Sequence, residues 1–231
     1  MSTRAAAAVL LIAVAACRAE PEPSRFPAAH RPVAPIVSDS FSTEDARDRV
    51  GEAEEVMRLA GVTPGMSVAD IGAGEGYYTT RLSPIVGARG RVLAQDISPG
   101  TRDRLAQRVQ RENLDNVAVR LGEPADPKIP TKSFDRIFLV HMYHEVTEPY
   151  EFLWHLREGL KDGGLIIVVD ADRPVKRHGM PPKQLICELA SVGLQPVAAR
   201  RLSGSDAYFA SFRIAAPRPQ PAAIRPCEVE G

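Results

Sequence analysis

The sequence predicts an α/β fold: a three-layer sandwich in which helices cover both faces of a seven-stranded, mostly parallel sheet. Three observations support this prediction. Short apolar runs alternate with amphipathic segments five times along the chain, which is the pattern of parallel βα units. A glycine-rich turn follows the first apolar run, where such sheets bind ligands. Two last apolar runs, 195–202 and 207–214, have no helix between them and predict an antiparallel hairpin that closes the sheet.

Each predicted element has a local signal. The first helix has capping-box spacing at Ser42 and Asp45, and Gly61 stands where the helix should end. The strands are short apolar runs, and the helices carry an apolar stripe. In chain order, the predicted elements are helix 43–60, strand 67–71, helix 77–86, strand 91–97, helix 101–112, strand 116–121, strand 134–140, helix 149–160, strand 165–170, helix 183–192 and the hairpin strands 195–202 and 207–214.

The turn after the first strand is the strongest functional signal. Residues 68–77 read Val-Ala-Asp-Ile-Gly-Ala-Gly-Glu-Gly-Tyr. Its alternate glycines let the backbone turn sharply and let a ligand approach the main chain. A dinucleotide-binding turn needs G-x-G-x-x-G, and Tyr77 stands here at the position of its third glycine. The turn therefore argues against an oxidoreductase of the NAD-binding type, and a purely structural glycine turn is the alternative.

An acid two residues before the first of these glycines resembles motif I of the class I S-adenosylmethionine-dependent methyltransferases. The resemblance covers about residues 62–213 and includes Leu-Lys-Asp-Gly-Gly at 160–164. It implies a Rossmann-like sandwich, S-adenosyl-L-methionine as the cofactor and methyl transfer as the activity. The cofactor-binding residues that it implies are Asp70, Gly72, Ala73, Gly74, Gly76, Asp96, Ile97, Glu123 and Asp126.

Three of these acids have alternatives. Asp96 ends the second strand, from where a carboxylate can accept hydrogen bonds from both hydroxyls of a ribose. It could equally form the turn before Ser98. The resemblance places an adenine-binding group in the loop after the third strand, and it leaves open whether Glu123 or Asp126 provides it. Either one could simply be a solvated loop acid.

A polar cluster follows the fourth strand at its carboxyl end. His141, Tyr143 and His144, with Glu145 beside them, could act as a general base or donate hydrogen bonds to a substrate, and we take the first three as catalytic candidates. The alternative is one histidine beside the cofactor and a packing role for the rest. The family's Asn/Asp-Pro-Pro-Tyr motif is missing, so the resemblance argues against methylation of a nucleobase or a glutamine amide. No metal ligands are predicted.

The amino terminus reads as a targeting segment. Residues 1–17 combine Arg4, a short apolar run and Val-Ala-Ala-Cys, which resembles a bacterial lipoprotein signal in which Cys17 receives the lipid. The expected location is the periplasmic face of the outer membrane, because no aspartate follows Cys17; a cytoplasmic enzyme is the alternative. Residues 18–40 are predicted to be a proline-rich linker, 41–214 the methyltransferase domain and 215–231 a disordered proline-rich tail.

Composition limits the remaining choices. The chain has 29 basic and 29 acidic residues and a formal net charge of zero, so no nucleic-acid partner is expected. Cys187 and Cys227 are interpreted as free thiols, although an oxidising compartment would permit a disulfide. The sequence thus favours a methyltransferase for a small-molecule acceptor. The alternative is a non-catalytic lipoprotein that keeps the fold as a cofactor-binding scaffold.

Overall fold

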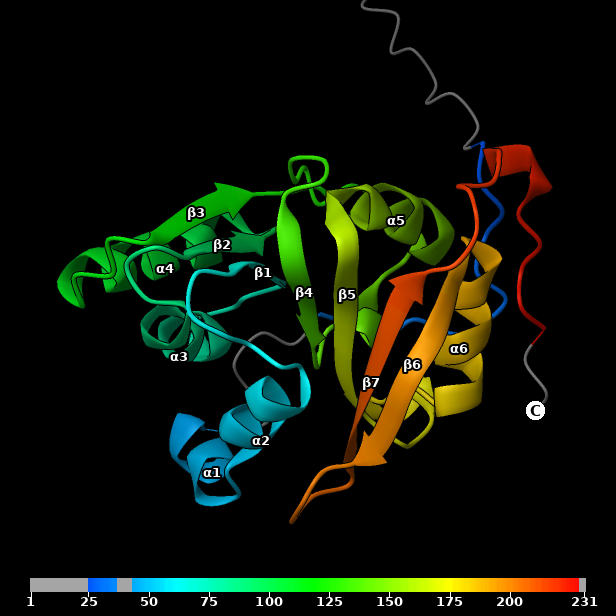
Figure 1. Cartoon of the computed structure of the whole chain (residues 1–231). Helices are drawn as coiled ribbons and strands as arrows, with labels where there is room; N and C mark the ends of the chain where they lie inside the picture. Colours follow the sequence, from blue (N-terminus) through cyan, green and yellow to red (C-terminus); the bar gives the residue numbers. More distant parts are fainter. Residues whose placement is uncertain (1–24, 37–42, 229–231) are drawn as a thin grey trace, which may run out of the picture.

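The computed structural model describes residues 25–36 and 43–228 (Figure 1). Its seven-stranded sheet has the order β3-β2-β1-β4-β5-β7-β6. The first five strands run parallel, and β7 pairs antiparallel with both β5 and β6, which confirms the predicted fold class. The strands are β1 Ser67–Ile71, β2 Arg91–Asp96, β3 Val117–Leu121, β4 Phe134–Val140, β5 Leu160–Ala171, β6 Leu194–Arg201 and β7 Ala207–Ile214.

Helices cover both faces of this sheet (Figure 1). They are α1 Glu44–Arg49, α2 Glu52–Leu59, α3 Tyr77–Val86, α4 Pro99–Arg111, α5 Pro149–Leu156 and α6 Pro182–Ser191, and four short 3-10 turns are η1 Tyr143–Glu145, η2 Arg157–Gly159, η3 Val175–Arg177 and η4 Pro221–Ala223. Within the described residues, no helix is long and apolar enough to cross a bilayer.

The alternation of side chains along the strands separates two hydrophobic cores. In β4, Phe138 packs with residues of α2 and α3, whereas its neighbours Ile137 and Leu139 pack with residues of α5 and α6. All three side chains are fully buried, which explains why β4 is an unbroken apolar run rather than an alternating one.

The amino-terminal helix differs from its prediction. The structure divides residues 43–60 into α1 and α2, because Gly51 adopts a left-handed conformation with φ 66° between them. Thr43, rather than Ser42, caps α1 by accepting a hydrogen bond from the Ala46 amide, and Ser42 lies outside the described residues. After this break, α1 lies beside α3, where Asp48 accepts a hydrogen bond from the Tyr77 hydroxyl at 2.8 Å.

Residues 215–228 pack against the domain, whereas the sequence predicted a disordered tail. The Pro219 carbonyl accepts a hydrogen bond from the Trp154 indole at 2.8 Å, and the Ala216 carbonyl accepts one from Arg157 at 2.8 Å. Ile224 is buried in the core. Proline-rich composition predicted weak local structure, but contacts with α5 and η2 hold this segment against the domain.

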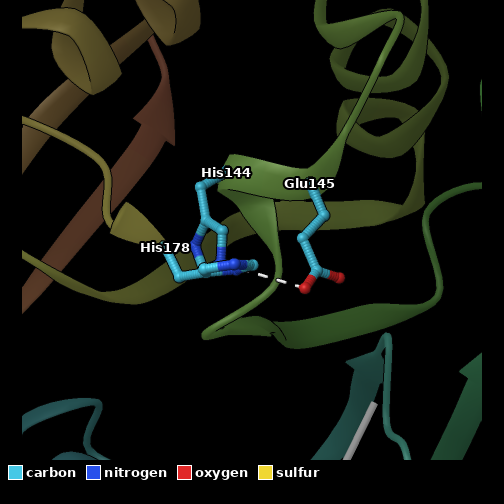
Figure 2. A group of neighbouring side chains, drawn as sticks. All are labelled: His144, Glu145 and His178. Atoms are coloured by element: carbon cyan, nitrogen blue, oxygen red, sulfur yellow. Dashed lines mark ion pairs between the residues drawn. The ribbon is translucent and has the colours of Figure 1, made fainter. Parts of the chain in front are cut away.

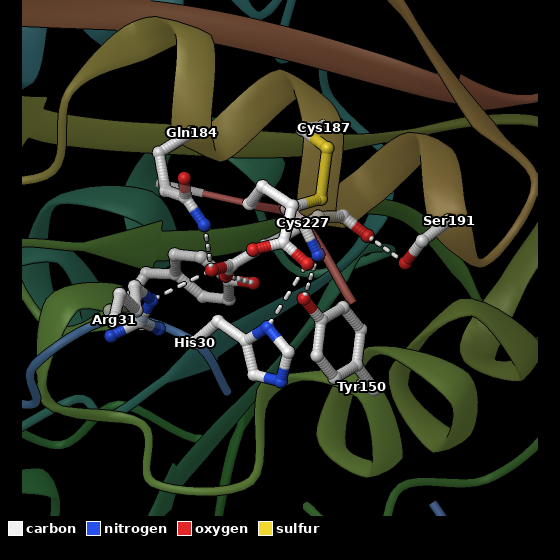
Figure 3. Close-up of a disulfide and its surroundings, with 10 residues drawn as sticks. His30, Arg31, Tyr150, Gln184, Cys187, Ser191 and Cys227 are labelled. Atoms are coloured by element: carbon white, nitrogen blue, oxygen red, sulfur yellow. Dashed lines mark hydrogen bonds and ion pairs between the residues drawn. A yellow bond between two sulfur atoms is a disulfide. The ribbon is translucent and has the colours of Figure 1, made fainter. Parts of the chain in front are cut away.

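Cys187 and Cys227 form a disulfide, which corrects the interpretation as two free thiols (Figure 3). Cys187 lies on the exposed face of α6, not on the apolar face that the sequence suggested, so the tail can reach it. The Cys227 amide also donates a hydrogen bond to the Tyr150 hydroxyl at 2.7 Å. The disulfide therefore fixes the end of the tail to the core.

Part of the predicted linker also packs against the domain. Arg31 is buried, and its guanidinium forms an ion pair with Glu188 at 2.8 Å (Figure 3). The Ala34 amide donates a hydrogen bond to the His144 carbonyl at 3.1 Å. Residues 25–36 thus reach the loop after β4, while residues 1–24, including Cys17, lie outside the described residues.

Candidate active site

One cavity of about 980 Å³ lies at the carboxyl ends of the parallel strands. Residues from the ends of β1, β2, β4 and β5 line it, together with side chains of α1. Parallel strands bring their carboxyl ends to one edge of a sheet, and ligands bind at this edge where the strand order reverses. Here the order reverses between β1 and β4, which places the glycine-rich turn at the centre of the cavity wall.

Strand register brings the first and second strand ends together. Ile71 lies beside Gln95 in the sheet, so the glycines after β1 face Asp96 at the end of β2. The Gly74 amide donates a hydrogen bond to the Asp96 carboxylate at 3.1 Å. Gly74 has φ 57°, a conformation that side-chain-bearing residues rarely adopt. The turn can therefore offer bare backbone to the cavity.

The three glycines do not share one role. Gly72 and Gly74 line the cavity, together with Ala73, whereas Gly76 is buried below it at the start of α3. A Cβ atom on Gly76 would lie 2.5 Å from the Leu105 side chain of α4. Gly76 thus packs closely against α4, whereas Gly72 and Gly74 line the cavity, where a Cβ atom on Gly72 would lie 2.9 Å from the Met142 side chain.

Asp70 lines the cavity from the end of β1 although it is only 2% exposed. Its burial raises the pKa of the carboxyl group from 3.8 to about 6, and a hydrogen bond from the Thr79 hydroxyl at 2.7 Å only partly opposes this effect. An ionised Asp70 is therefore costly without a cation nearby. The arrangement suits a ligand that carries a positive charge.

Asp96 is held in two ways. One carboxylate oxygen accepts a hydrogen bond from the Ser98 amide at 2.8 Å, so Asp96 does form the turn considered as the alternative. The other oxygen faces Gly74 and the cavity, which Ile97 also lines. The two roles are compatible, because the turn fixes the orientation in which the second oxygen faces the cavity.

The two candidates for adenine binding, Glu123 and Asp126, lie outside the cavity. Glu123 and Asp126 form ion pairs with Lys128, at 3.3 Å and 3.0 Å, and neither lines the cavity. Between them, Pro124 does line it. This loop thus contributes an apolar surface to the cavity, and its acids bind a neighbouring lysine.

His141 and His144 line the cavity, but Tyr143 does not. The Tyr143 side chain is fully buried, and its hydroxyl donates a hydrogen bond to Glu188 of α6 at 2.6 Å. Burial strongly raises the pKa of the Tyr143 hydroxyl, with a further contribution from the Glu188 carboxylate. The structure therefore places Tyr143 in the core and removes it from the catalytic candidates.

The two histidines have carboxylate partners that the sequence analysis missed. His141 Nε2 lies 3.0 Å from Glu52 Oε2, and His144 Nδ1 lies 2.9 Å from a carboxylate oxygen of Asp170. Glu52 comes from α2, far away in the sequence. Asp170 lies one residue before the end of β5, which pairs with β4, so the strand order of the sheet brings this pair together.

Glu52 connects the amino-terminal helices to the cavity. Burial alone would raise the pKa of Glu52, but the His141 imidazole and the Arg47 guanidinium outweigh burial and lower this pKa to about 2. Tyr78 of α3 also donates a hydrogen bond to Glu52 at 3.1 Å. These contacts hold α1 and α2 over the glycine-rich turn as one wall of the cavity.

Tyr77, which replaces the third glycine of a dinucleotide turn, lies beneath α1. The Arg47 and Arg81 guanidinium groups lie 3.9 Å and 3.8 Å from the centre of its ring, and its hydroxyl donates a hydrogen bond to Asp48 at 2.8 Å. The position is thus occupied by a side chain that anchors a helix. This contact explains physically why the chain departs from the dinucleotide pattern.

Comparisons with known proteins agree with this geometry. Residues 69–168 match the family described as a methyltransferase domain. The chain is 27% identical over 157 residues to a ubiquinone/menaquinone biosynthesis C-methyltransferase of Ectopseudomonas mendocina, covering 66% of this chain and 59% of that protein. It is 35% identical over 117 residues to a demethylmenaquinone methyltransferase of Tropheryma whipplei, covering 51% and 46%. The chain thus spans about half the length of the curated relatives it matches.

Solved structures show the same fold. A SAM-dependent methyltransferase from Aquifex aeolicus superimposes with a TM-score of 0.69 at 24% identity, covering 74% of this chain and 93% of that one. The [4+2]-cyclase SpnF superimposes with a TM-score of 0.63 at 14% identity, covering 80% and 89%. Residues 69–168 are thus similar to a methyltransferase domain, and the chain has the fold of these solved structures.

Proposed function

We propose that the chain binds S-adenosylmethionine at the glycine-rich turn and transfers its methyl group to a small organic acceptor in the same cavity. The observation that carries this proposal is the continuity of the cavity. One space of about 980 Å³ connects Asp70, Gly74 and Asp96 with the loop of His141 and His144. This volume lies at the upper end of the range for small-molecule sites, about 300–1,000 Å³, so it suits a cofactor and an acceptor together.

The residues at the turn fit the three parts of the cofactor. Asp70 provides a buried carboxylate for the cofactor's ammonium group, and Gly72 and Gly74 offer backbone for close approach. Asp96 can accept hydrogen bonds from ribose hydroxyls, and Pro124 offers an apolar contact for the base. Because a sulfonium group already carries a good leaving group, positioning the acceptor in line with the methyl group supplies most of the rate.

The acceptor is expected to be a compact molecule with an apolar body. Val140, Met142 and Phe152 line the acceptor end together with His141 and His144. One relative is named as a ubiquinone/menaquinone biosynthesis C-methyltransferase and another as a demethylmenaquinone methyltransferase, which supports a ring-containing acceptor. A chain with this cavity lining can hold such a ring by apolar contact and orient its polar atom toward an imidazole.

Turnover can be tested with methyl-labelled S-adenosylmethionine and a panel of quinols, phenols and thiols. We expect label to enter at least one ring-containing acceptor, and His144→Ala to reduce this transfer more than cofactor binding. If no acceptor is labelled while the cofactor binds, the non-catalytic alternative replaces this proposal. A structure of the same fold is named as a [4+2]-cyclase, so the fold does not by itself imply methyl transfer.

We also propose that the mature chain is exported and anchored by a lipid on Cys17. The apolar segment that ends in Val-Ala-Ala-Cys supports this proposal, and the Cys187–Cys227 disulfide supports an oxidising compartment. Cys17→Ser should abolish labelling by a radioactive fatty acid and release the chain from the membrane fraction. A parent chain that is unlabelled and keeps an intact amino terminus contradicts the proposal.

A further inference from the structure

A second cluster of side chains lies at the acceptor end of the cavity. His144 and Glu145 come from η1 after β4, and His178 comes from the turn after η3. One ligand atom from each of the three lies within 4.8 Å of the others (Figure 2). The imidazoles meet edge to face with 5.6 Å between ring centres, and all three residues line the cavity.

The surroundings hold the His144 side chain and the His178 backbone in defined positions. His144 is 3% exposed, and Asp170 binds its Nδ1 atom from a fully buried position, which leaves Nε2 on the side of Glu145, 3.9 Å from Oε1. His178 has φ 55°, and its carbonyl accepts a hydrogen bond from Arg173 at 3.1 Å. A histidine in the left-handed region is uncommon and is kept only where the surrounding structure determines it.

We propose that His144, Glu145 and His178 bind a divalent transition-metal ion of the Zn²⁺ type. Two imidazoles and one carboxylate are a ligand set of zinc sites that keep a fourth position open. Imidazole nitrogen suits zinc, copper, iron and nickel, whereas Mg²⁺ and Ca²⁺ prefer oxygen ligands. The Asp170 contact with His144 Nδ1 is the carboxylate–histidine arrangement that orients a metal-binding imidazole.

The distances permit binding after small side-chain movements. Ligand atoms around a tetrahedral zinc ion lie about 3.3 Å apart, given metal–ligand bonds of about 2.0–2.2 Å. Glu145 and His178 are partly exposed, so their side chains can move toward His144, which is the buried and fixed member. The open fourth position would then face the cavity that all three residues line.

The site extends the proposed function without depending on it. If the proposed methyl transfer is correct, a cation here would contact an oxygen or sulfur atom of the acceptor and lower the pKa of its hydroxyl or thiol group. Metal binding itself requires only the three side chains and their supporting carboxylate. The two proposals can therefore fail separately.

Metal binding should be measured on the tag-free full chain, because an affinity tag of histidines would bind the same ions. We expect calorimetric titration with Zn²⁺ to show one saturable site, and Co²⁺ to give a visible absorption spectrum of a low-symmetry site. His178→Ala should weaken Zn²⁺ binding by at least 100-fold. Asp170→Asn should weaken it by about 10–100-fold, the usual effect of losing a supporting partner of a ligand.

His155→Ala is the matched control, because His155 is a partly exposed histidine that does not line the cavity. It should bind Zn²⁺ like the parent. Thermal unfolding and titration with S-adenosylmethionine should show that the His178→Ala chain remains folded. A parent chain that binds no Zn²⁺, or equal affinities of the His178→Ala and His155→Ala chains, overturns the proposal whatever the outcome for cofactor binding.

Discussion

Replacing Asp70 with asparagine tests whether burial makes ionisation of this carboxyl group unfavourable in the folded protein. The carboxyl group is 2% exposed, and burial raises its pKa from 3.8 to about 6. Asparagine keeps the shape and can still accept the hydrogen bond from Thr79, but it cannot ionise. The substitution therefore removes the charge while leaving the packing close to that of the parent.

Proton binding decides whether the free energy of unfolding rises or falls with pH. The unfolded chain ionises Asp70 above about pH 4, whereas the folded protein keeps it protonated up to about pH 6, so the folded state binds more protons in this interval. The free energy of unfolding of the parent should then fall as the pH rises from about 4 to about 6. At about 1.36 kcal/mol for each pH unit, the full cost above pH 6 is about 3 kcal/mol.

The assay is urea unfolding of the parent and the Asp70→Asn chain at pH 4.5 and pH 7.5, with the disulfide intact. Other titrating groups are common to both chains and cancel in the comparison. About 1 kcal/mol of the cost is already present at pH 4.5, so the variant should gain about 2 kcal/mol relative to the parent between the two pH values. A gain below about 0.5 kcal/mol, or a loss, would refute the reasoning.

Three further predictions follow from single contacts. Asp96→Ala should weaken binding of S-adenosylmethionine by about 1.5–3 kcal/mol, about tenfold or more, in calorimetric titration; unchanged affinity would leave Asp96 as a turn residue only. Cys187→Ser should lower the free energy of unfolding by about 4 kcal/mol, since the disulfide closes 40 residues, and a loss below 1 kcal/mol in urea unfolding would show that the tail is held without it. Gly76→Ala should cost about 1–3 kcal/mol by the same assay, because its Cβ would press against Leu105; a neutral result would contradict that packing.

Much of the fold could be predicted because its signals are local. β1, β4 and α3 begin and end at the predicted residues, since apolar runs and glycines mark their limits. The division of the first helix was missed because apolar spacing continues across Gly51, and a glycine inside a helix pattern does not by itself reveal a left-handed turn. The order of the tail was missed because it depends on Cys187 and Trp154, which lie far away in the sequence.

The sequence placed Asp70 and Asp96 at strand ends, and both line the cavity, while their role in binding stays a prediction. Asp70 and Asp96 meet because parallel strands place their carboxyl ends at one edge. The sequence could not separate Tyr143 from His144, since a short 3-10 turn has no apolar period that assigns one side chain to the core and the next to the cavity. Glu52 was missed because its partner, His141, lies on another element.

The central claim is that the cavity binds S-adenosylmethionine. Calorimetric titration of the purified full chain with S-adenosylmethionine, with its demethylated product and with NAD tests this claim most directly. We predict saturable binding of the first two ligands at one site and no binding of NAD, and loss of binding in a folded Gly74→Val chain, whose branched side chain would occupy the cofactor's space. Absence of binding by the parent, equal binding of NAD, or unchanged affinity in Gly74→Val would contradict the account.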